Sequence, residues 1–317
     1  MKRTVASVVV LVALGSFNLA EAGAATVGSG GFGTTLQFSA APGEINDVTI
    51  ARSGETYTVT DTINLISPGS GCSSASNPGS TEADHSVICH NPSFPDHLYL
   101  ELLANLGDMS DSLVVTAEYG DLVVYGEAGN DTITWLPSGD LAANVRYRES
   151  FFSGGDGDDA ITASAGIDHI QGGAGADTIL AGGGRDFLDG GADPDSIFGG
   201  RGHDTITGGG GDDFLNGEVG SDVIDGQANA DTIIGDVGKD RLTGGYGPDV
   251  LRGGADPDTI YGLGGGDRIF GGAGFDALFG GRGFDLCRLG MGGGTKGGCE
   301  TYPVRRCQSY PSFADPD

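Results

Sequence analysis

A nonapeptide period dominates this sequence and constrains its fold more than any other feature. From Gly154 to Arg288 the chain divides into fifteen consecutive nine-residue units without an insertion or deletion, among them GGAGADTIL, GGRGHDTIT and GGYGPDVLR. Self-similarity at a fixed short period is typical of solenoids. The sequence therefore predicts one stacked coil over these 135 residues.

The sixth position of the unit is the most regular. It is aspartate in all fifteen repeats, while the eighth position is Ile or Leu in fourteen repeats and Cys287 in the last. The fifteen aspartates are Asp159, Asp168, Asp177, Asp186, Asp195, Asp204, Asp213, Asp222, Asp231, Asp240, Asp249, Asp258, Asp267, Asp276 and Asp285. Acidic residues at one fixed position of a repeat indicate an ordered structure, because a disordered acidic segment does not require regular spacing.

Glycine shapes the backbone of each unit. The fourth position is Gly in twelve repeats, and Asp193, Asn229 and Asp256 fill the others; these residue types tolerate a positive φ. The first position is Gly in thirteen repeats, whereas the second position is more variable. Six turn-forming residues followed by a triplet such as Thr-Ile-Leu indicate a tight turn and a very short strand. Two units per full turn then make a parallel coil.

In such a coil each repeat lies about 4.8 Å from the second repeat along the chain. The Ile/Leu positions form a narrow core, and the aspartates form two ladders of like charge. Neighbouring carboxylates at this spacing repel by roughly 3 kcal/mol at an effective dielectric near 20. Ca²⁺ relieves that repulsion, because it accepts about six to eight oxygens from carboxylates and backbone carbonyls. Aspartate beside glycine is also common in simple turns, but fifteen in one frame favour the cation.

These motifs resemble the repeats-in-toxin (RTX) family, whose hemolysin-type calcium-binding repeat reads GGxGxDxUx. The resemblance implies an all-β fold, a parallel β-roll solenoid of nonapeptide repeats with Ca²⁺ between stacked loops. It implies that the fifteen aspartates are side-chain ligands and that the loop glycines provide carbonyl oxygens. Because each site would lie between a repeat and the second repeat after it, at most about thirteen sites are expected. Loops with Glu218, Gln227, Asp236 or Leu263 at the second position depart from the pattern and are expected to bind weakly or stay empty.

The composition agrees with calcium as the partner. The chain has 61 glycines and a net charge of −28, which suits neither nucleic acid nor an anionic membrane surface. Calcium would neutralise the acidic repeats, so binding and folding are expected to be one event.

The N-terminal segment indicates export. Residues 1–24 have a basic start, an apolar run from Val5 to about Leu14 and small residues at Ala20, Ala22 and Ala24, as in a secretory signal peptide. An uncleaved membrane anchor is disfavoured because Asn18 and Glu21 interrupt the apolar run, and no other segment is apolar enough to be transmembrane. We expect a secreted, extracellular protein. Extracellular calcium modules work at about 10⁻⁴ to 10⁻³ M.

Five cysteines fit an oxidising environment. The expected pairs are Cys72 with Cys89 and Cys287 with Cys299, which leaves Cys307 odd; Cys299 with Cys307 is an open alternative. The RTX family's best-known members seldom carry cysteine and leave the cell through a C-terminal signal, so this chain departs from them in both respects.

The sequence predicts five segments. Residues 1–24 are the signal peptide, and residues 25–107 form a small N-terminal β domain with a hairpin around Ser53-Gly54. Residues 108–153 hold degenerate repeats, including GEAGNDTIT with the further candidate ligand Asp131, and a loop or broken coil over 135–153. Residues 154–288 form the β-roll, and 289–317 form a C-terminal cap and tail, because the repeat degenerates after Arg288.

Three functions remain open from the sequence. The first is a secreted calcium-binding protein without enzymatic activity, since HExxH and GxSxG motifs are missing from the sequence. The second is a calcium-dependent adhesion protein that meets a cell-surface or matrix partner through its N-terminal domain or through the outward residues Phe198, Tyr261, Phe270 and Phe279. The third is a secreted hydrolase or cytolysin with a site in residues 26–107. The sequence identifies no partner.

Overall fold

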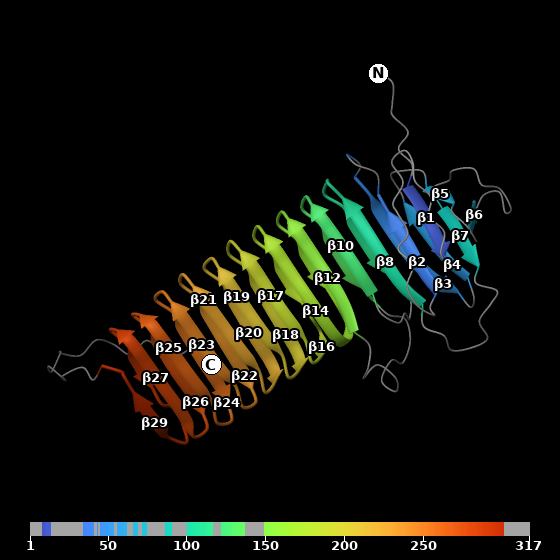
Figure 1. Ribbon diagram of the computed structural model, residues 1–317. Coiled ribbons are helices and arrows are strands. Elements are labelled where there is room, and N and C mark those ends of the chain that lie inside the picture. The colour runs from blue at the N-terminus through green and yellow to red at the C-terminus, as the bar shows by residue number, and fades with distance from the viewer. Residues whose placement is uncertain are drawn as a thin grey trace, which may run out of the picture.

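The computed structural model describes residues 8–13, 34–40, 43, 45–53, 56–61, 66–68, 72–74, 86–90, 100–116, 122–136 and 149–300. The regular elements in these ranges are β-strands, and the strands stack into one elongated body (Figure 1). Within the same ranges, no helix has the length and hydropathy that a bilayer crossing requires.

Two long sheets, here called sheet A and sheet B, form the two faces of this body. Sheet A contains β1 (Val8–Ala13), β2 (Thr34–Ser39), β5 (Ile66–Pro68), β8 (Leu100–Gly107), β10 (Leu122–Ala128), β12 (Glu149–Asp156), β14 (Ala165–Ala174), β17 (Phe187–Ala192), β19 (Thr205–Gly210), β21 (Val223–Ala228), β23 (Arg241–Tyr246), β25 (Thr259–Gly265), β27 (Asp276–Gly283) and β29 (Gly294–Gly297). Sheet B contains β3 (Asp47–Ser53), β4 (Thr56–Asp61), β6 (Cys72–Ser74), β7 (Ser86–His90), β9 (Ser112–Val115), β11 (Thr132–Trp135), β13 (Ala160–Thr162), β15 (Thr178–Leu180), β16 (Gly183–Gly184), β18 (Ser196–Gly202), β20 (Phe214–Gly220), β22 (Thr232–Val237), β24 (Val250–Ala255), β26 (Arg268–Ala273) and β28 (Leu286–Arg288).

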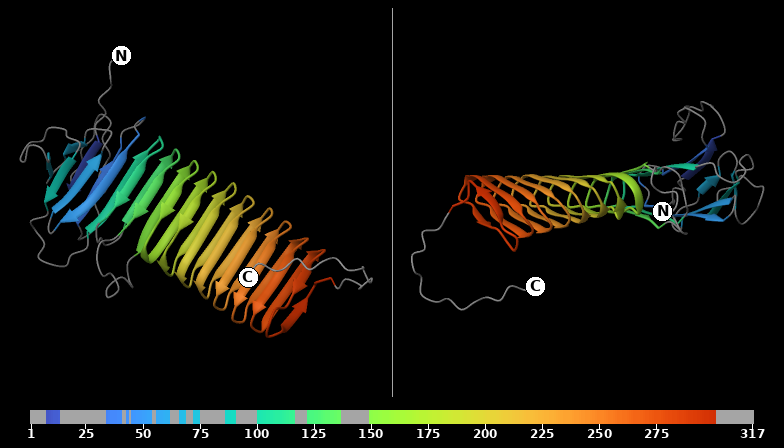
Figure 2. Two further views of the ribbon diagram at one scale, coloured as in Figure 1. Left: turned by 180° about the vertical axis from the view of Figure 1, so that it is seen from behind. Right: turned by 90° about the horizontal axis from the view of Figure 1, so that it is seen from below.

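The pairing of these strands confirms the predicted parallel β-roll. Within the repeats, each strand pairs in parallel with the strand two repeats away, so that Leu188 lies opposite Ile206 in sheet A and Leu215 lies opposite Ile233 in sheet B. From β17 onward, successive strands alternate between the sheets, and the view from below shows the two strand layers winding along the coil (Figure 2, right). Two nonapeptides therefore make one turn.

The core is a single column of aliphatic side chains between the sheets. The eighth-position residues from Ile161 to Leu278 are at most 3% exposed, and they join one cluster with Phe38, Trp135 and Phe152. Burying one Ile or Leu side chain contributes about 1.5 to 3 kcal/mol. The column therefore holds the sheets together along their length, while Cys287 and Leu289 cover its C-terminal end.

Positive φ angles occur at two positions of the turn. At the fourth position, Asp193, Asn229 and Asp256 have φ of 74°, 82° and 74°, as the sequence predicts. The residue type at the second position varies in the sequence, yet the backbone there also takes a positive φ, even at Gln227 (72°) and Leu263 (73°). Side chains vary there because most point away from the coil, as at the exposed Gln227, Asp236 and Leu263. Ser164 is an exception, since its φ is not positive and its Oγ is buried.

The N-terminal strands extend both sheets of the solenoid. Strand β2 pairs in parallel with β8, and β8 pairs with β10; on the other face, β3 pairs with β9 and β9 with β11. The expected hairpin is present, because β3 and β4 pair antiparallel with Ser53 opposite Thr56. The sheets are therefore continuous across residue 107, the boundary expected between the small β domain and the degenerate repeats.

Two segments contain strands that the sequence did not predict. Trp135 ends strand β11 and is 1% exposed, and residues 149–153 lie in β12, so the two ends of the expected loop or broken coil over 135–153 are strands. The stretch 137–148 lies outside the described residues. Val8–Ala13, within the expected signal peptide, forms strand β1 along the edge of β2.

The cysteines near the C-terminus pair as expected. Cys287 and Cys299 form a disulfide with a Cα–Cα distance of 5.7 Å. At the other end, the register of β6 and β7 sets the Cα atoms of Cys72 and Cys89 opposite each other. Cys307 lies outside the described residues.

Candidate metal sites

The sixth-position aspartates are buried, although aspartate normally stays in water. All fifteen, and Asp131 before them, are at most 3% exposed. Each stands two residues before the buried aliphatic residue of its own repeat, or before Cys287 in the last repeat. The coil thus removes sixteen carboxylates from solvent.

Backbone hydrogen bonds join these aspartates into two ladders. The N–H of one aspartate donates to Oδ1 of the aspartate one turn later, over 2.7–3.1 Å. Ladder A, before the strands of sheet A, contains Asp168, Asp186, Asp204, Asp222, Asp240, Asp258 and Asp276. Ladder B, before the strands of sheet B, contains Asp111, Asp131, Asp159, Asp177, Asp195, Asp213, Asp231, Asp249, Asp267 and Asp285.

The second carboxylate oxygen defines the candidate site. Oδ2 of all sixteen predicted aspartates is buried without a hydrogen-bond partner. Except in the repeats of Asp168 and Asp186, which begin with alanine, Oδ2 lies close to the first glycine of its own repeat. A Cβ added at Gly154 would overlap Oδ2 of Asp159 and lie 2.6 Å from the carbonyl oxygen of Gly172. Gly253 repeats this arrangement with Asp258 and with the Gly271 carbonyl at 2.5 Å. Carboxylate and carbonyl oxygens thus converge without a donor between them.

The electrostatics of the ladders favour a bound cation. Desolvation by burial raises the pKa of Asp177 and Asp195 to about 7 and that of Asp186 to about 8. The backbone N–H bond from the preceding turn lowers each pKa, and neighbouring ladder carboxylates raise it. A divalent ion beside Oδ2 would supply the missing positive charge.

The donor set suits a hard cation. In the described part of the chain, no group of three or more His, Cys, Asp or Glu side chains could hold a metal ion by itself. The oxygens that converge here come from carboxylates and from backbone carbonyls of glycines, which is the mixture that Ca²⁺ accepts. The buried, regularly spaced aspartates therefore fit calcium.

Three residues of ladder B were missed as candidate ligands. Asp111 donates its N–H to Asp131 and is 3% exposed, and the buried Asn46 donates its N–H to Asp111 Oδ1. At the other end, Glu300 Oε2 accepts the N–H of Asp285. Asp111 stands two residues before Leu113, which is the Asp-to-Leu spacing of the repeats, so the sequence pattern could have identified it. Asn46 and Glu300 lie outside the nonapeptide frame, so no sequence pattern pointed to them.

The loops that depart from the consensus keep its backbone. The carbonyl oxygens of Gln227, Asp236 and Leu263 approach the second-position glycine one turn later, as those of glycines do elsewhere in the stack. The expectation of weak or empty sites in these loops therefore finds no support in the backbone, and it remains a prediction.

The histidines in the repeats lie on the outside. His203 is exposed, and its Nδ1 accepts the N–H of Ser221 at 2.8 Å. His169 stacks on Phe187 with ring centroids 4.8 Å apart. His85 and His97 lie outside the described residues.

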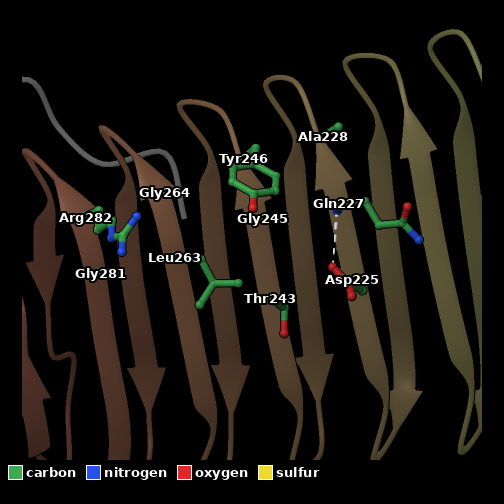
Figure 3. A pocket seen from close by; sticks show the side chains of 10 residues that line it. All are labelled: Asp225, Gln227, Ala228, Thr243, Gly245, Tyr246, Leu263, Gly264, Gly281 and Arg282. Atoms are coloured by element: carbon green, nitrogen blue, oxygen red, sulfur yellow. Dashed lines mark hydrogen bonds between the residues drawn. The ribbon is translucent and has the colours of Figure 1, made fainter.

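The outer faces carry rings and arginines near the C-terminal end. Tyr261 stacks on Phe279 with centroids 5.0 Å apart, and Arg241 lies over Tyr261 at 5.2 Å. A hollow of about 780 Å³ on the outer face of sheet A is lined by Tyr246 and Leu263 among others (Figure 3). On sheet B, Arg252 and Arg268 both lie over Phe270, and Phe198 contacts Phe214.

The fold and the two aspartate ladders define a metal-binding β-solenoid of nonapeptide repeats. Comparison with protein families identifies the repeats directly: the RTX calcium-binding nonapeptide repeat matches residues 116–134, 153–188, 181–215, 189–224, 207–242, 243–278 and 252–287. The matched residues are RTX calcium-binding nonapeptide repeats. Among curated proteins, none matches the chain.

Proposed function

We propose that this protein is a secreted calcium-binding protein whose repeats bind Ca²⁺ between stacked turns and fold on binding. One observation carries the proposal: each predicted aspartate has a buried Oδ2 that lacks a hydrogen-bond partner. In most repeats this oxygen lies close to a carbonyl oxygen of the next turn, at the first-position glycine. The sixteen predicted aspartates are the proposed side-chain ligands, with glycine carbonyls completing each site. The proposed role is binding and folding rather than catalysis.

The energetics link binding to folding. A buried ionised carboxylate without a partner is costly, and the ladders repeat this cost along the whole stack. Without a cation, neutral pH therefore disfavours the closed coil. An ion that binds the folded chain and not the unfolded chain stabilises it by mass action.

Secretion is part of the proposal and is supported by the sequence of residues 1–24. A chain unfolded at the low calcium of the cytosol would meet its ligand after export. Cleavage after this segment would remove β1 and leave β2 at the edge of sheet A. N-terminal sequencing of the secreted protein tests this step directly.

The central experiment is a calcium titration of protein stripped of metal, followed by far-ultraviolet circular dichroism. We expect a cooperative transition from coil to β-structure near millimolar Ca²⁺ and none with Mg²⁺. The double variant Asp213→Ala, Asp231→Ala, which removes adjacent residues of ladder B, should shift the midpoint to higher calcium.

Asp189→Ala is the matched control, because Asp189 is an exposed aspartate of the same repeats that lies outside both ladders. It should titrate like the unmodified protein. A spectrum that is already β-rich in chelator and unchanged by calcium would contradict the proposal, and the aspartates would then be turn residues.

Calcium-dependent adhesion is the second candidate, favoured by one observation on the outer face. Leu263 keeps a positive φ of 73° and is 49% exposed, where glycine would avoid the strain. Tyr246 beside it is 80% exposed (Figure 3). Strained backbone at an exposed position is often retained for function. Exposed rings on one face suit stacking against the sugar rings of a neutral polysaccharide.

Binding to an immobilised neutral polysaccharide in calcium tests this candidate. The double variant Tyr246→Ser, Leu263→Gly should keep its calcium-dependent circular dichroism and lose retention on the polymer. Equal retention of both proteins would remove the support that this face lends to adhesion.

A further inference from the structure

Ladder B continues beyond the last nonapeptide. The sequence pattern ends at Asp285, because Gly294 and Pro303 stand where the next two aspartates would be. In the structure, however, Glu300 Oε2 accepts the N–H of Asp285, as Oδ1 of the next aspartate does elsewhere in the ladder. The N–H of Glu300 donates in return to the carbonyl oxygen of Asp285 at 3.0 Å. Glu300 therefore takes the place of an aspartate three residues before the frame would supply one.

The oxygens at this end are arranged as in the interior sites. Asp285 is fully buried, and its Oδ2 has no hydrogen-bond partner. A Cβ added at Gly280 would overlap the carbonyl oxygen of Gly298 and lie 2.6 Å from Oδ2 of Asp285. Gly298 follows Gly280 by eighteen residues, the spacing of one full turn. The terminal turn thus repeats the convergence of carboxylate and carbonyl seen at Gly253.

Two contacts hold Glu300 in position. Strand β29 pairs with β27 in the usual register, with Lys296 opposite Leu278. The Cys287–Cys299 disulfide then ties the residue before Glu300 to the end of the core column. The Lys296 amino group donates to the Cys287 carbonyl oxygen at 3.3 Å.

We propose that Asp285, Glu300 and the Gly298 carbonyl form a terminal Ca²⁺ site that the Cys287–Cys299 disulfide closes. The inference rests on the proposed function and adds one site to it, formed by a residue outside the repeats. The competing explanation is that Glu300 only caps the ladder by accepting the Asp285 N–H. An amide could do the same, whereas a cation site needs the negative charge.

Native mass spectrometry of the full, disulfide-bonded chain counts the bound ions and separates these explanations. Glu300→Gln keeps a hydrogen-bond acceptor and removes the charge, and it should bind one Ca²⁺ fewer than the unmodified protein. Asp189→Asn, which neutralises an exposed carboxylate outside both ladders, is the control and should leave the count unchanged. Ions are counted at a calcium concentration where circular dichroism shows equal β-content in all three proteins.

Cys299→Ser tests the role of the disulfide without altering a proposed ligand. We expect loss of the same single ion, or at least a tenfold weaker last binding step. An unchanged count in Glu300→Gln would overturn the terminal site and leave Glu300 as a cap. An unmodified protein that binds no calcium at all would instead contradict the proposed function, so the two failures are distinguishable.

Discussion

The backbone N–H of Asp195 donates a 2.9 Å hydrogen bond to Oδ1 of Asp213, one turn further along ladder B. Oδ2 of both residues is buried without a partner. One carboxylate oxygen thus links consecutive turns, while the other remains for a cation. The same division recurs along both ladders, so each aspartate has a structural and a proposed ligand role.

Asp213→Asn should separate these two roles. The amide oxygen can still accept the N–H of Asp195, but the charge is lost, and with it a repulsion of roughly 3 kcal/mol between neighbours at an effective dielectric near 20. We expect more β-structure in chelator and a higher calcium midpoint than in the unmodified protein. Circular dichroism with and without calcium measures both effects. Asp189→Asn is the control. A higher calcium midpoint without a gain of β-structure in chelator would contradict the division of roles.

The metal-free protein should become more structured as the pH falls. The folded-state pKa values of Asp177, Asp195 and Asp249 are raised to about 7 and that of Asp186 to about 8, chiefly by desolvation, whereas an unfolded aspartate titrates near 3.9. The folded coil therefore holds more protons than the unfolded chain. Its stability is greatest below about pH 4 and is lost as the pH rises through about 7 to 8.

Circular dichroism of protein freed of metal by a chelating resin, recorded from pH 5 to 8.5, checks this expectation while staying above the sequence pI of about 4.1. The calcium midpoint should also rise as the pH falls, because protons and Ca²⁺ compete for the same oxygens. A metal-free spectrum that does not change over this range would show that the ladders stay ionised or that the coil is open throughout.

Gly253→Ala should weaken calcium binding and destabilise the coil by about 1 to 3 kcal/mol. The added methyl group would meet Oδ2 of Asp258 and lie 2.5 Å from the Gly271 carbonyl oxygen. Gly210→Ala is the matched control, since nothing lies within 4 Å of its Cβ and its φ is not positive. Urea unfolding in calcium compares the two, and an equal loss in both would contradict the crowding at the first position.

Leu251→Ala should cost about 2 to 5 kcal/mol, because Leu251 is fully buried in the aliphatic column. Leu286→Ala, at an outward position that is 40% exposed, should change stability by less than about 0.5 kcal/mol. Urea unfolding of the calcium-loaded variants gives both values. Comparable losses would mean that the column does not carry the stability assigned to it.

The repeat region was predictable from the sequence because its physics is local. Each nonapeptide contains its own turn glycines, its own buried Ile or Leu and its own aspartate, so one period fixes strand length, register and the face of every side chain. Ala163 and Ala181 are informative exceptions at the first position: the backbone there leaves the strand conformation, which fits the crowding of a Cβ at that place.

The ends of the solenoid depended on tertiary structure. Asn46 and Asp111 join ladder B because β3 and β9 pair in sheet B, although they are 65 residues apart in sequence. Glu300 reaches Asp285 because β29 returns along β27 and the disulfide holds the following turn. The sequence by itself determined the repeated coil and its aspartates, since these depend on nine neighbouring residues; only the tertiary structure decided which residues close the ladders, since those contacts depend on chain segments brought together by sheet pairing.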